Sequence, residues 1–217
     1  MQEEIIRNVK EKKLIAIVRG VEPEYIITLG KALAAGGINM IEVTFDQRST
    51  DHFAATTSAI EKLSSEMGGE VYVGSGTVLT KEQVDMTAAA GGQYIITPSV
   101  NPEVIRYAKE KGLVAMPGAL TPTEAVTAWE AGADFVKIFP AGNLGPAYIK
   151  AVRAPLAHIP FLAVGGVNAQ NIPDFLKVGV TGFGVGGNLV NREWVKNGET
   201  DKITALAAEF VAAVNSI

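Results

Sequence analysis

Short apolar runs alternate with helix-like segments along the whole chain. The first run, residues 14–18, contains five apolar residues and ends at Arg19-Gly20, and the helical pattern that follows it stops at Gly36-Gly37. Short apolar runs bounded by glycine or polar residues are typical of strands that are buried on both faces of a sheet. The pattern predicts strands at 14–18, 39–43, 71–73, 94–96, 114–116, 135–139, 161–164 and 181–185. It predicts helices at 23–35, about 50–66, 81–90, 102–111, from Thr121-Pro122 onward, about 146–154, 171–177 and 201–215.

This alternation predicts an α/β fold of the (β/α)₈ TIM-barrel type, because strands and helices follow one another about eight times. The spacings are too short for a second domain, so we expect a single domain over residues 1–217. An open, doubly wound sheet is the alternative. It would show fewer units and a dinucleotide-type glycine pattern at the first helix, which Arg19-Gly20-Val21 does not supply.

One charged residue, Lys137, interrupts the apolar run at 135–139. A lysine in a buried strand needs a partner or a function. It could be an ion-paired or snorkelling side chain. It could instead be an amine whose pKa is lowered by burial, so that it attacks a carbonyl and forms a Schiff base. The strand alone leaves both interpretations open.

The carboxyl ends of barrel strands, where TIM-barrel enzymes carry their chemistry, hold a carboxylate and a guanidinium. Glu42 lies between Ile41 and Val43 and could pair with Lys137 or transfer protons; a surface carboxylate is the alternative. Arg19 follows the first strand and could grip a substrate carboxylate or form a structural ion pair. We take Lys137 and Glu42 as the candidate catalytic residues.

Hydroxyl, proline and aromatic residues occupy other strand ends. Thr44, Thr77 and Thr97 could contact substrate or only bond to the backbone. Pro98 is expected to shape a turn, and Phe139 is expected to pack in the barrel. By position, Thr44, Thr77, Pro98 and Phe139 are also candidate substrate-binding residues.

Two glycine pairs follow the seventh and eighth predicted strands. They are Gly165-Gly166 and Gly186-Gly187, and Asn188 comes directly after the second pair. Barrels often bind phosphate at this place through backbone N–H groups, which glycine lets an anion approach closely. Tight turns are the alternative. We take all five residues as candidate substrate-binding residues.

Composition narrows the class of partner. The net charge is −4 with 19% charged residues, so we expect neither nucleic acid nor a membrane as partner. There are no cysteines, and His52 and His158 stand outside any ligand-spaced cluster, so we expect no metal. The acidic start and the lack of a long apolar run predict neither a signal peptide nor a membrane span. We expect a cytoplasmic enzyme that acts on small molecules.

The chain resembles the class I aldolases that act on 2-keto-3-deoxy-6-phosphogluconate and its relatives. The matching stretches follow the family's order over nearly the whole chain: Ala35-Gly36-Gly37-Ile38, Ile41-Glu42-Val43-Thr44, Gly74-Ser75-Gly76-Thr77-Val78, Ile96-Thr97-Pro98, Met116-Pro117-Gly118, Val136-Lys137-Ile138-Phe139-Pro140-Ala141, Val164-Gly165-Gly166-Val167 and Gly184-Val185-Gly186-Gly187. The resemblance implies a cofactor-free homotrimer of barrels. It implies that Lys137 forms a Schiff base with pyruvate, that Glu42 is the general acid and base, and that Thr77 and Pro98 line the pyruvate site.

The chain departs from the family pattern at three positions. Some members carry arginine where this chain has Asp46, so the grip on the substrate carboxylate is expected to fall to Arg19, with Arg48 as the alternative. Gluconate-type members often have threonine and serine where this chain has Val164 and Asn188. Galactonate-type relatives resemble residues 163–167 of this chain.

The leading hypothesis is therefore a pyruvate aldolase that cleaves 2-keto-3-deoxy-6-phosphogluconate, a close relative such as 2-keto-3-deoxy-6-phosphogalactonate, or 4-hydroxy-2-oxoglutarate. Two alternatives stay open. A sugar-phosphate isomerase or epimerase would use Glu42 as base and Lys137 as an electrostatic stabiliser. A phospho-sugar sensor would keep the pocket without turnover.

Overall fold

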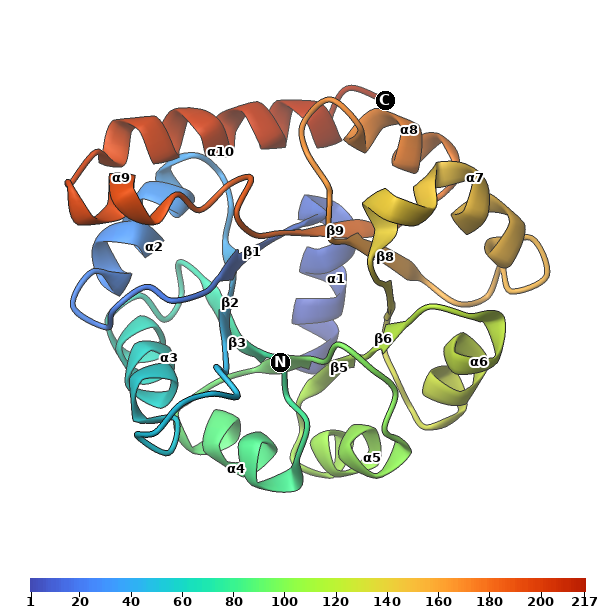
Figure 1. The fold of residues 1–217 in the computed structure, drawn as a ribbon, viewed down its shortest axis with the longest axis horizontal. Coiled ribbons are helices and arrows are strands. Elements are labelled where there is room, and N and C mark those ends of the chain that lie inside the picture. The colour runs from blue at the N-terminus through green and yellow to red at the C-terminus, as the bar shows by residue number, and fades with distance from the viewer.

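The computed structural model describes residues 1–217 and shows a ring of strands surrounded by helices (Figure 1). The strands are β1 (Leu14–Val18), β2 (Met40–Thr44), β3 (Tyr72–Gly76), β4 (Tyr94–Ile96), β5 (Val114–Met116), β6 (Gly118–Ala119), β7 (Val136–Ile138), β8 (Phe161–Val164) and β9 (Gly182–Val185). The helices are α1 (Gln2–Lys12), α2 (Ile26–Ala35), α3 (Ala54–Glu66), α4 (Lys81–Ala89), α5 (Pro102–Glu110), α6 (Pro122–Glu130), α7 (Ala141–Arg153), α8 (Ile172–Lys177), α9 (Arg192–Lys196) and α10 (Thr200–Val214).

The parallel sheet closes through one interrupted strand. Its order is β5-β4-β3-β2-β1-β9-β8-β7-β6, and only Pro117 separates the two outermost members, β5 and β6. Proline has no N–H and breaks the ladder, while its carbonyl still accepts a hydrogen bond from the Lys137 backbone N–H at 2.8 Å. β5 and β6 are therefore two halves of one strand, and the predicted TIM-barrel architecture is confirmed. The sequence prediction had included only the first half.

Side chains alternate between two sides of the barrel wall. One buried cluster fills the space between strands and helices, and a smaller one fills the barrel interior with residues such as Met40, Tyr94 and Phe135. Because successive strand residues face opposite sides, Glu42 and Lys137, two positions after Met40 and Phe135, face the interior too. The register of the strands therefore directs both candidate groups to one space.

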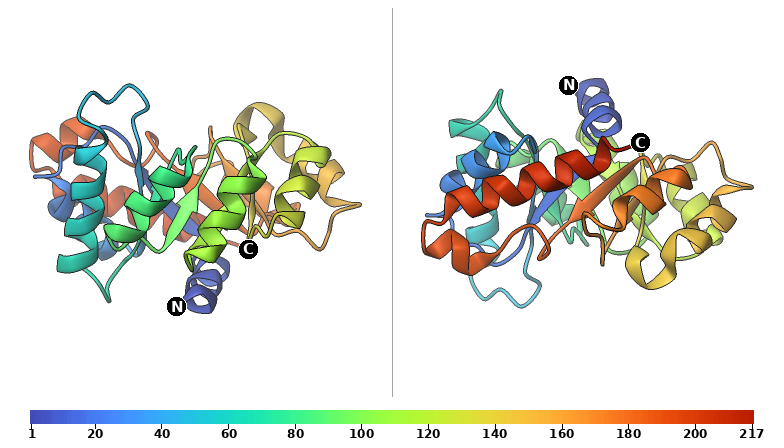
Figure 2. Two further views of the ribbon diagram at one scale, coloured as in Figure 1. Left: turned by 90° about the horizontal axis from the view of Figure 1, so that it is seen from below. Right: turned by 90° about the horizontal axis from the view of Figure 1, so that it is seen from above.

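Three helical features differ from the sequence prediction. α1 was not predicted; it lies across the amino-terminal end of the barrel (Figure 2), where Ile5 and Val9 join the interior cluster. α9 was not predicted either. α7 begins at Ala141 instead of 146, because Gly145 at φ 75° separates an early turn from the segment that Pro146 opens.

The loops above the barrel are fixed by helix caps. Thr80 accepts a hydrogen bond from the Gln83 N–H, and Thr121 accepts one from the Glu124 N–H, so α4 and α6 both begin with capping boxes. These caps define where the loops after β3 and β6 end. None of the helices combines the length and apolar character that crossing a membrane requires.

Candidate active site

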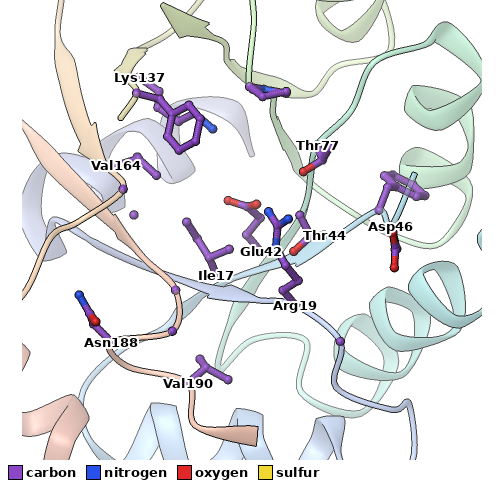
Figure 3. A pocket seen from close by; sticks show the side chains of 18 of the residues that line it. Ile17, Arg19, Glu42, Thr44, Asp46, Thr77, Lys137, Val164, Asn188 and Val190 are labelled. Atoms are coloured by element: carbon purple, nitrogen blue, oxygen red, sulfur yellow. The ribbon is translucent and has the colours of Figure 1, made fainter. Parts of the chain in front are cut away.

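A cavity of about 1010 Å³ opens at the carboxyl end of the barrel (Figure 3). It brings together all the candidate catalytic and substrate-binding residues: Arg19, Glu42, Thr44, Thr77, Pro98, Lys137, Phe139, Gly165, Gly166, Gly186, Gly187 and Asn188. Thr97 does not line it, because the Thr97 hydroxyl bonds to the backbone of Ser99 and Gly118. The strand-end rule thus identified residues that are distant in sequence but share one cavity.

Lys137 and Glu42 are buried in this cavity, with 7% and 3% of their surfaces exposed. Figure 3 shows the two side chains reaching into the same space from separate strands. Glu42 Oε2 has no hydrogen-bond partner, and neither residue belongs to an ion pair. The interpretation of Lys137 as an ion-paired or snorkelling lysine therefore does not fit the structure.

Burial shifts both groups toward their neutral forms. It raises the pKa of Glu42 to about 7, although the positive charges of Lys137 and Arg19 oppose the rise. Burial also lowers the pKa of Lys137. The negative charge of Glu42 opposes this shift, and the positive charge of Arg19 adds to it. A lysine with a lowered pKa has more free amine at neutral pH, and a carboxyl group that titrates near 7 both gives and accepts protons there.

Contacts before and beside β7 hold Lys137 in place. Asp134 Oδ2 accepts hydrogen bonds from the Ala115 N–H at 2.8 Å and from Lys109 Nζ at 2.6 Å. This links the start of β7 to β5, and the backbone of Lys137 then pairs with Gly118 in β6. The nucleophile candidate thus stands on a strand anchored on both sides of the Pro117 interruption.

Two glycines on β3 make room for the side chains that enter from β2 and β4. A Cβ on Gly76 would lie 1.6 Å from Glu42 Oε1, and a Cβ on Gly74 would lie 2.3 Å from the ring of Tyr94. Both distances are far below contact distance, so the Glu42 carboxyl group depends on the missing side chain of Gly76.

We expect Gly76→Ala to lower kcat by about tenfold to a hundredfold, because the new methyl group must displace the Glu42 carboxyl group by more than an ångström. Steady-state kinetics with a thermal melt on the same sample checks this. An unchanged kcat in a folded variant would show that the position of Glu42 has little effect on turnover.

Of the two arginines considered for the substrate carboxylate, only Arg19 is free. Arg48 is paired with Asp46 through Nε–Oδ1 and Nη2–Oδ2 distances of 3.2 Å, and its side chain is 91% exposed. Arg19 is in no ion pair, and its charge acts on both Glu42 and Lys137. The structure favours Arg19. The Thr44 hydroxyl also lines the cavity, but it donates to the Val18 carbonyl at 2.7 Å and so bonds to the backbone.

Phe139 does not pack inside the barrel, contrary to the sequence prediction. It is 40% exposed in the cavity, and Lys137 Nζ lies 5.0 Å from the centroid of its ring. A Cβ on Gly165 would approach this ring to 3.0 Å. The ring is therefore part of the cavity wall between Lys137 and the first glycine pair.

The two glycine loops present unused backbone donors. The N–H groups of residues 165–167 and 186–188 donate to no protein acceptor, while the carbonyls of Gly165 and Gly166 accept from the Gly142 N–H and the Asn171 amide. Gly165 and Gly166 have φ values of 86° and 75°, which explains glycine there. Asn188 donates to the Val167 carbonyl at 2.8 Å and so ties the loops together. This arrangement suits an anion.

The sequence analysis missed one charged residue of the cavity, Arg192 at the start of α9. Arg192 was missed because α9 is only five residues long and shows no clear periodicity of apolar residues. The sequence feature that could have identified Arg192 is its position, a positively charged residue shortly after the second glycine pair. No group of three or more His, Cys, Asp or Glu side chains is placed to hold a metal ion, and metal independence stays a prediction.

The chain is similar in sequence to two aldolases. The chain is 42% identical over 180 residues to a probable 2-dehydro-3-deoxy-6-phosphogalactonate aldolase of Rhizobium meliloti, covering 82% of each protein. It is 38% identical to the Escherichia coli K12 2-dehydro-3-deoxy-6-phosphogalactonate aldolase, covering 92% of this chain and 93% of that protein.

Two solved structures share the fold over nearly their whole length. A native KDPGal structure matches with a TM-score of 0.85 and 36% identity, over 95% of this chain and 96% of that one. A KDPG aldolase from Legionella pneumophila, with pyruvate captured as a covalent carbinolamine intermediate, matches with a TM-score of 0.83 and 27% identity, over 94% and 96%. The model of the KDPG and KHG aldolase family matches residues 5–206. The chain belongs to the KDPG and KHG aldolase family and is a lyase.

Proposed function

We propose that this aldolase works through a Schiff base on Lys137 and cleaves 2-keto-3-deoxy-6-phosphogalactonate, or its C4 epimer 2-keto-3-deoxy-6-phosphogluconate, to pyruvate and glyceraldehyde 3-phosphate. The observation that carries the proposal is the pair formed by Lys137 and Glu42, both buried and facing one cavity. The names of the Rhizobium and Escherichia coli relatives favour the galactonate form. Val164, where gluconate-type members often have threonine, favours it too.

The first half of the reaction joins substrate to enzyme. The neutral Lys137 amine attacks the C2 carbonyl carbon, and Glu42 supplies the proton with which the carbinolamine oxygen leaves as water. The product is an iminium ion. Arg19, an unpaired guanidinium whose charge acts on both groups, would hold the C1 carboxylate.

The second half breaks the carbon–carbon bond. Glu42, now ionised, takes the proton of the C4 hydroxyl. The electrons of the C3–C4 bond then move into the iminium, so that the aldehyde is released and an enamine remains on Lys137. Glu42 then returns the proton to C3, and water hydrolyses the imine to release pyruvate and free Lys137. The unused N–H groups of the two glycine loops would hold the distal phosphate throughout.

Borohydride trapping tests the proposal. In the presence of pyruvate, reduction should add one pyruvyl group to the peptide that contains Lys137, as measured by mass spectrometry. Turnover should be compared between 2-keto-3-deoxy-6-phosphogalactonate and 2-keto-3-deoxy-6-phosphogluconate. Folded protein that gains no adduct would contradict the Schiff base, and isotope exchange without an imine would favour the isomerase alternative.

The protein is proposed to act as a homotrimer, as the family resemblance implies. A protein cage designed by fusing symmetric oligomeric domains matches this chain with a TM-score of 0.85 and 37% identity, over 95% of this chain and 73% of that one. Light scattering coupled to size exclusion measures the mass. The cytoplasmic location and the lack of a nucleic-acid partner stay predictions.

A further inference from the structure

Thr77 is the only non-glycine residue in the cavity wall with a left-handed backbone. Its φ is 56°. Residues branched at Cβ rarely adopt this conformation, and it persists only where neighbouring contacts hold it. Thr77 directly follows Gly76, the last residue of β3, and the Glu42 carboxyl group lies against Gly76. The strained residue therefore begins one peptide bond away from the backbone that the Glu42 carboxyl group contacts.

The Thr77 hydroxyl is free to bind a ligand. Of the polar groups of Thr77, only the carbonyl is bonded within the protein, whereas the N–H and the hydroxyl have no partner. The hydroxyls of Thr44 and Thr97, by contrast, both bond to the backbone. Figure 3 shows the Thr77 hydroxyl facing the space that Glu42 and Lys137 also enter. It is therefore available to an oxygen atom of a keto acid bound there.

Two glutamines in series hold the carbonyl of Thr77. Gln47, in the loop after β2, donates from Nε2 to this carbonyl at 3.0 Å. Gln47 Oε1 in turn accepts a hydrogen bond from Gln83 Nε2 at 3.2 Å. Because the oxygen and the NH₂ group of an amide point in different directions, a donor on the oxygen leaves the NH₂ group facing Thr77. Gln83 thus orients Gln47, and Gln47 holds Thr77.

Gln83 is a fixed starting point for this series. It is 1% exposed, and its Oε1 accepts hydrogen bonds from the N–H groups of Leu79 at 2.6 Å and Thr80 at 3.3 Å. The bond from Thr80 belongs to the capping box of α4. In the capping box of α6, Glu124 takes the corresponding place, so the cap does not require glutamine. What glutamine adds is an amide donor, and this donor is the group that engages Gln47.

We propose that Gln83 is a positioning residue of this aldolase: through Gln47 it holds Thr77 in the left-handed conformation that presents the Thr77 hydroxyl to an oxygen atom of the bound keto acid. Gln83 does not line the cavity, so it acts on the substrate only through the other two residues. The inference rests on the proposed function, because it assumes a keto acid bound beside Glu42 and Lys137.

The test compares Gln83→Glu with the wild type on 2-keto-3-deoxy-6-phosphogalactonate. Glutamate can still cap the helix, as Glu124 does, but it cannot donate to Gln47, whose NH₂ group must then turn toward it and away from Thr77. KM should rise about three- to tenfold, the usual effect of one hydrogen bond. The value of kcat should stay within about twofold, because this contact is made equally in the ground state and the transition state.

A second background separates positioning from a general effect on the fold. Thr77→Gly lacks the hydroxyl and adopts a positive φ without strain, so adding Gln83→Glu to it should change KM by less than about twofold. Gln47→Leu, at an exposed position, should reproduce the KM rise of Gln83→Glu. Gln170→Leu is its matched control, because Gln170 is exposed, bonds to Glu209 and lies outside the cavity. This control should leave KM and kcat unchanged.

An unchanged KM in Gln83→Glu, or an equal rise in the Thr77→Gly background, would overturn the assignment. Should Gln83→Glu fail to fold, Gln47→Leu takes its place in both backgrounds. Should the wild type cleave neither 2-keto-3-deoxy-6-phosphogalactonate nor its C4 epimer, the proposed function fails, and a crystal structure of Gln83→Glu then decides the positioning. A Thr77 that has left the left-handed region supports it, and a φ still near 56° refutes it.

Discussion

Replacing Lys137 with alanine is expected to lower kcat by roughly four to six orders of magnitude, as the loss of a covalent nucleophile commonly does. The neighbouring groups cannot substitute for the amine, because neither the guanidinium of Arg19 nor the carboxyl group of Glu42 forms an imine with a ketone. The variant should also form no borohydride-stable adduct with pyruvate.

The fold should survive this change, since it removes a buried amine that has no hydrogen-bond or ion-pair partner. Lys150→Ala, on the exposed side of α7, is the matched control and should keep full turnover. Single-turnover assays on both variants, with circular dichroism as a check of folding, make the comparison. Residual activity of Lys137→Ala above a thousandth of the wild type would refute covalent catalysis by this residue.

Replacing Glu42 with glutamine should lower kcat by about 10² to 10⁴, the usual contribution of a general acid or base. Glutamine keeps the size of the side chain, so Gly76 still accommodates it. The pKa of about 7 predicts a limb near pH 7 in the wild-type pH–rate profile, and this limb should be absent from the variant. A limb that persists in Glu42→Gln would assign it to another group.

The same group makes stability depend on pH in a defined direction. The pKa of Glu42 rises from an ordinary 4.5 to about 7 in the folded protein, so between these values the folded state keeps a proton that the unfolded state loses. The stabilisation is complete below pH 4.5 and is lost as the pH rises through 7. This corresponds to about 3 kcal/mol. Urea unfolding measures the difference. The free energy of unfolding of Glu42→Gln should rise relative to that of the wild type as the pH increases from 5 to 8.

Much of the barrel was predictable because its strands are short, apolar and separated by glycine or proline. Strand-end position then selected Glu42, Lys137 and the glycine pairs, which converge only after the sheet has closed. The prediction that Phe139 packs in the barrel was wrong, because the sequence pattern does not distinguish an apolar residue in the barrel interior from one that lines a cavity.

Other features depend on tertiary contacts that no local pattern contains. The role of Asn188 depends on the Val167 carbonyl of a different loop, and the position of Arg192 depends on Gly20, which is far away in sequence. The second half of the fifth strand is two residues long, too short to give a period of its own. The sequence could therefore predict which residues line the cavity, but not how these contacts arrange them.

Helix α1 has a consequence for how reactants travel. Because Ile5 and Val9 seal the lower mouth of the barrel, the substrate and both products must share the upper opening. In the proposed Schiff-base mechanism, the aldehyde is freed while the three-carbon fragment is still covalently attached to Lys137, so it must diffuse out past the occupied amine. This mechanism predicts a sequential departure, with the aldehyde first and pyruvate last, and we expect pyruvate to compete with the incoming keto acid for Lys137.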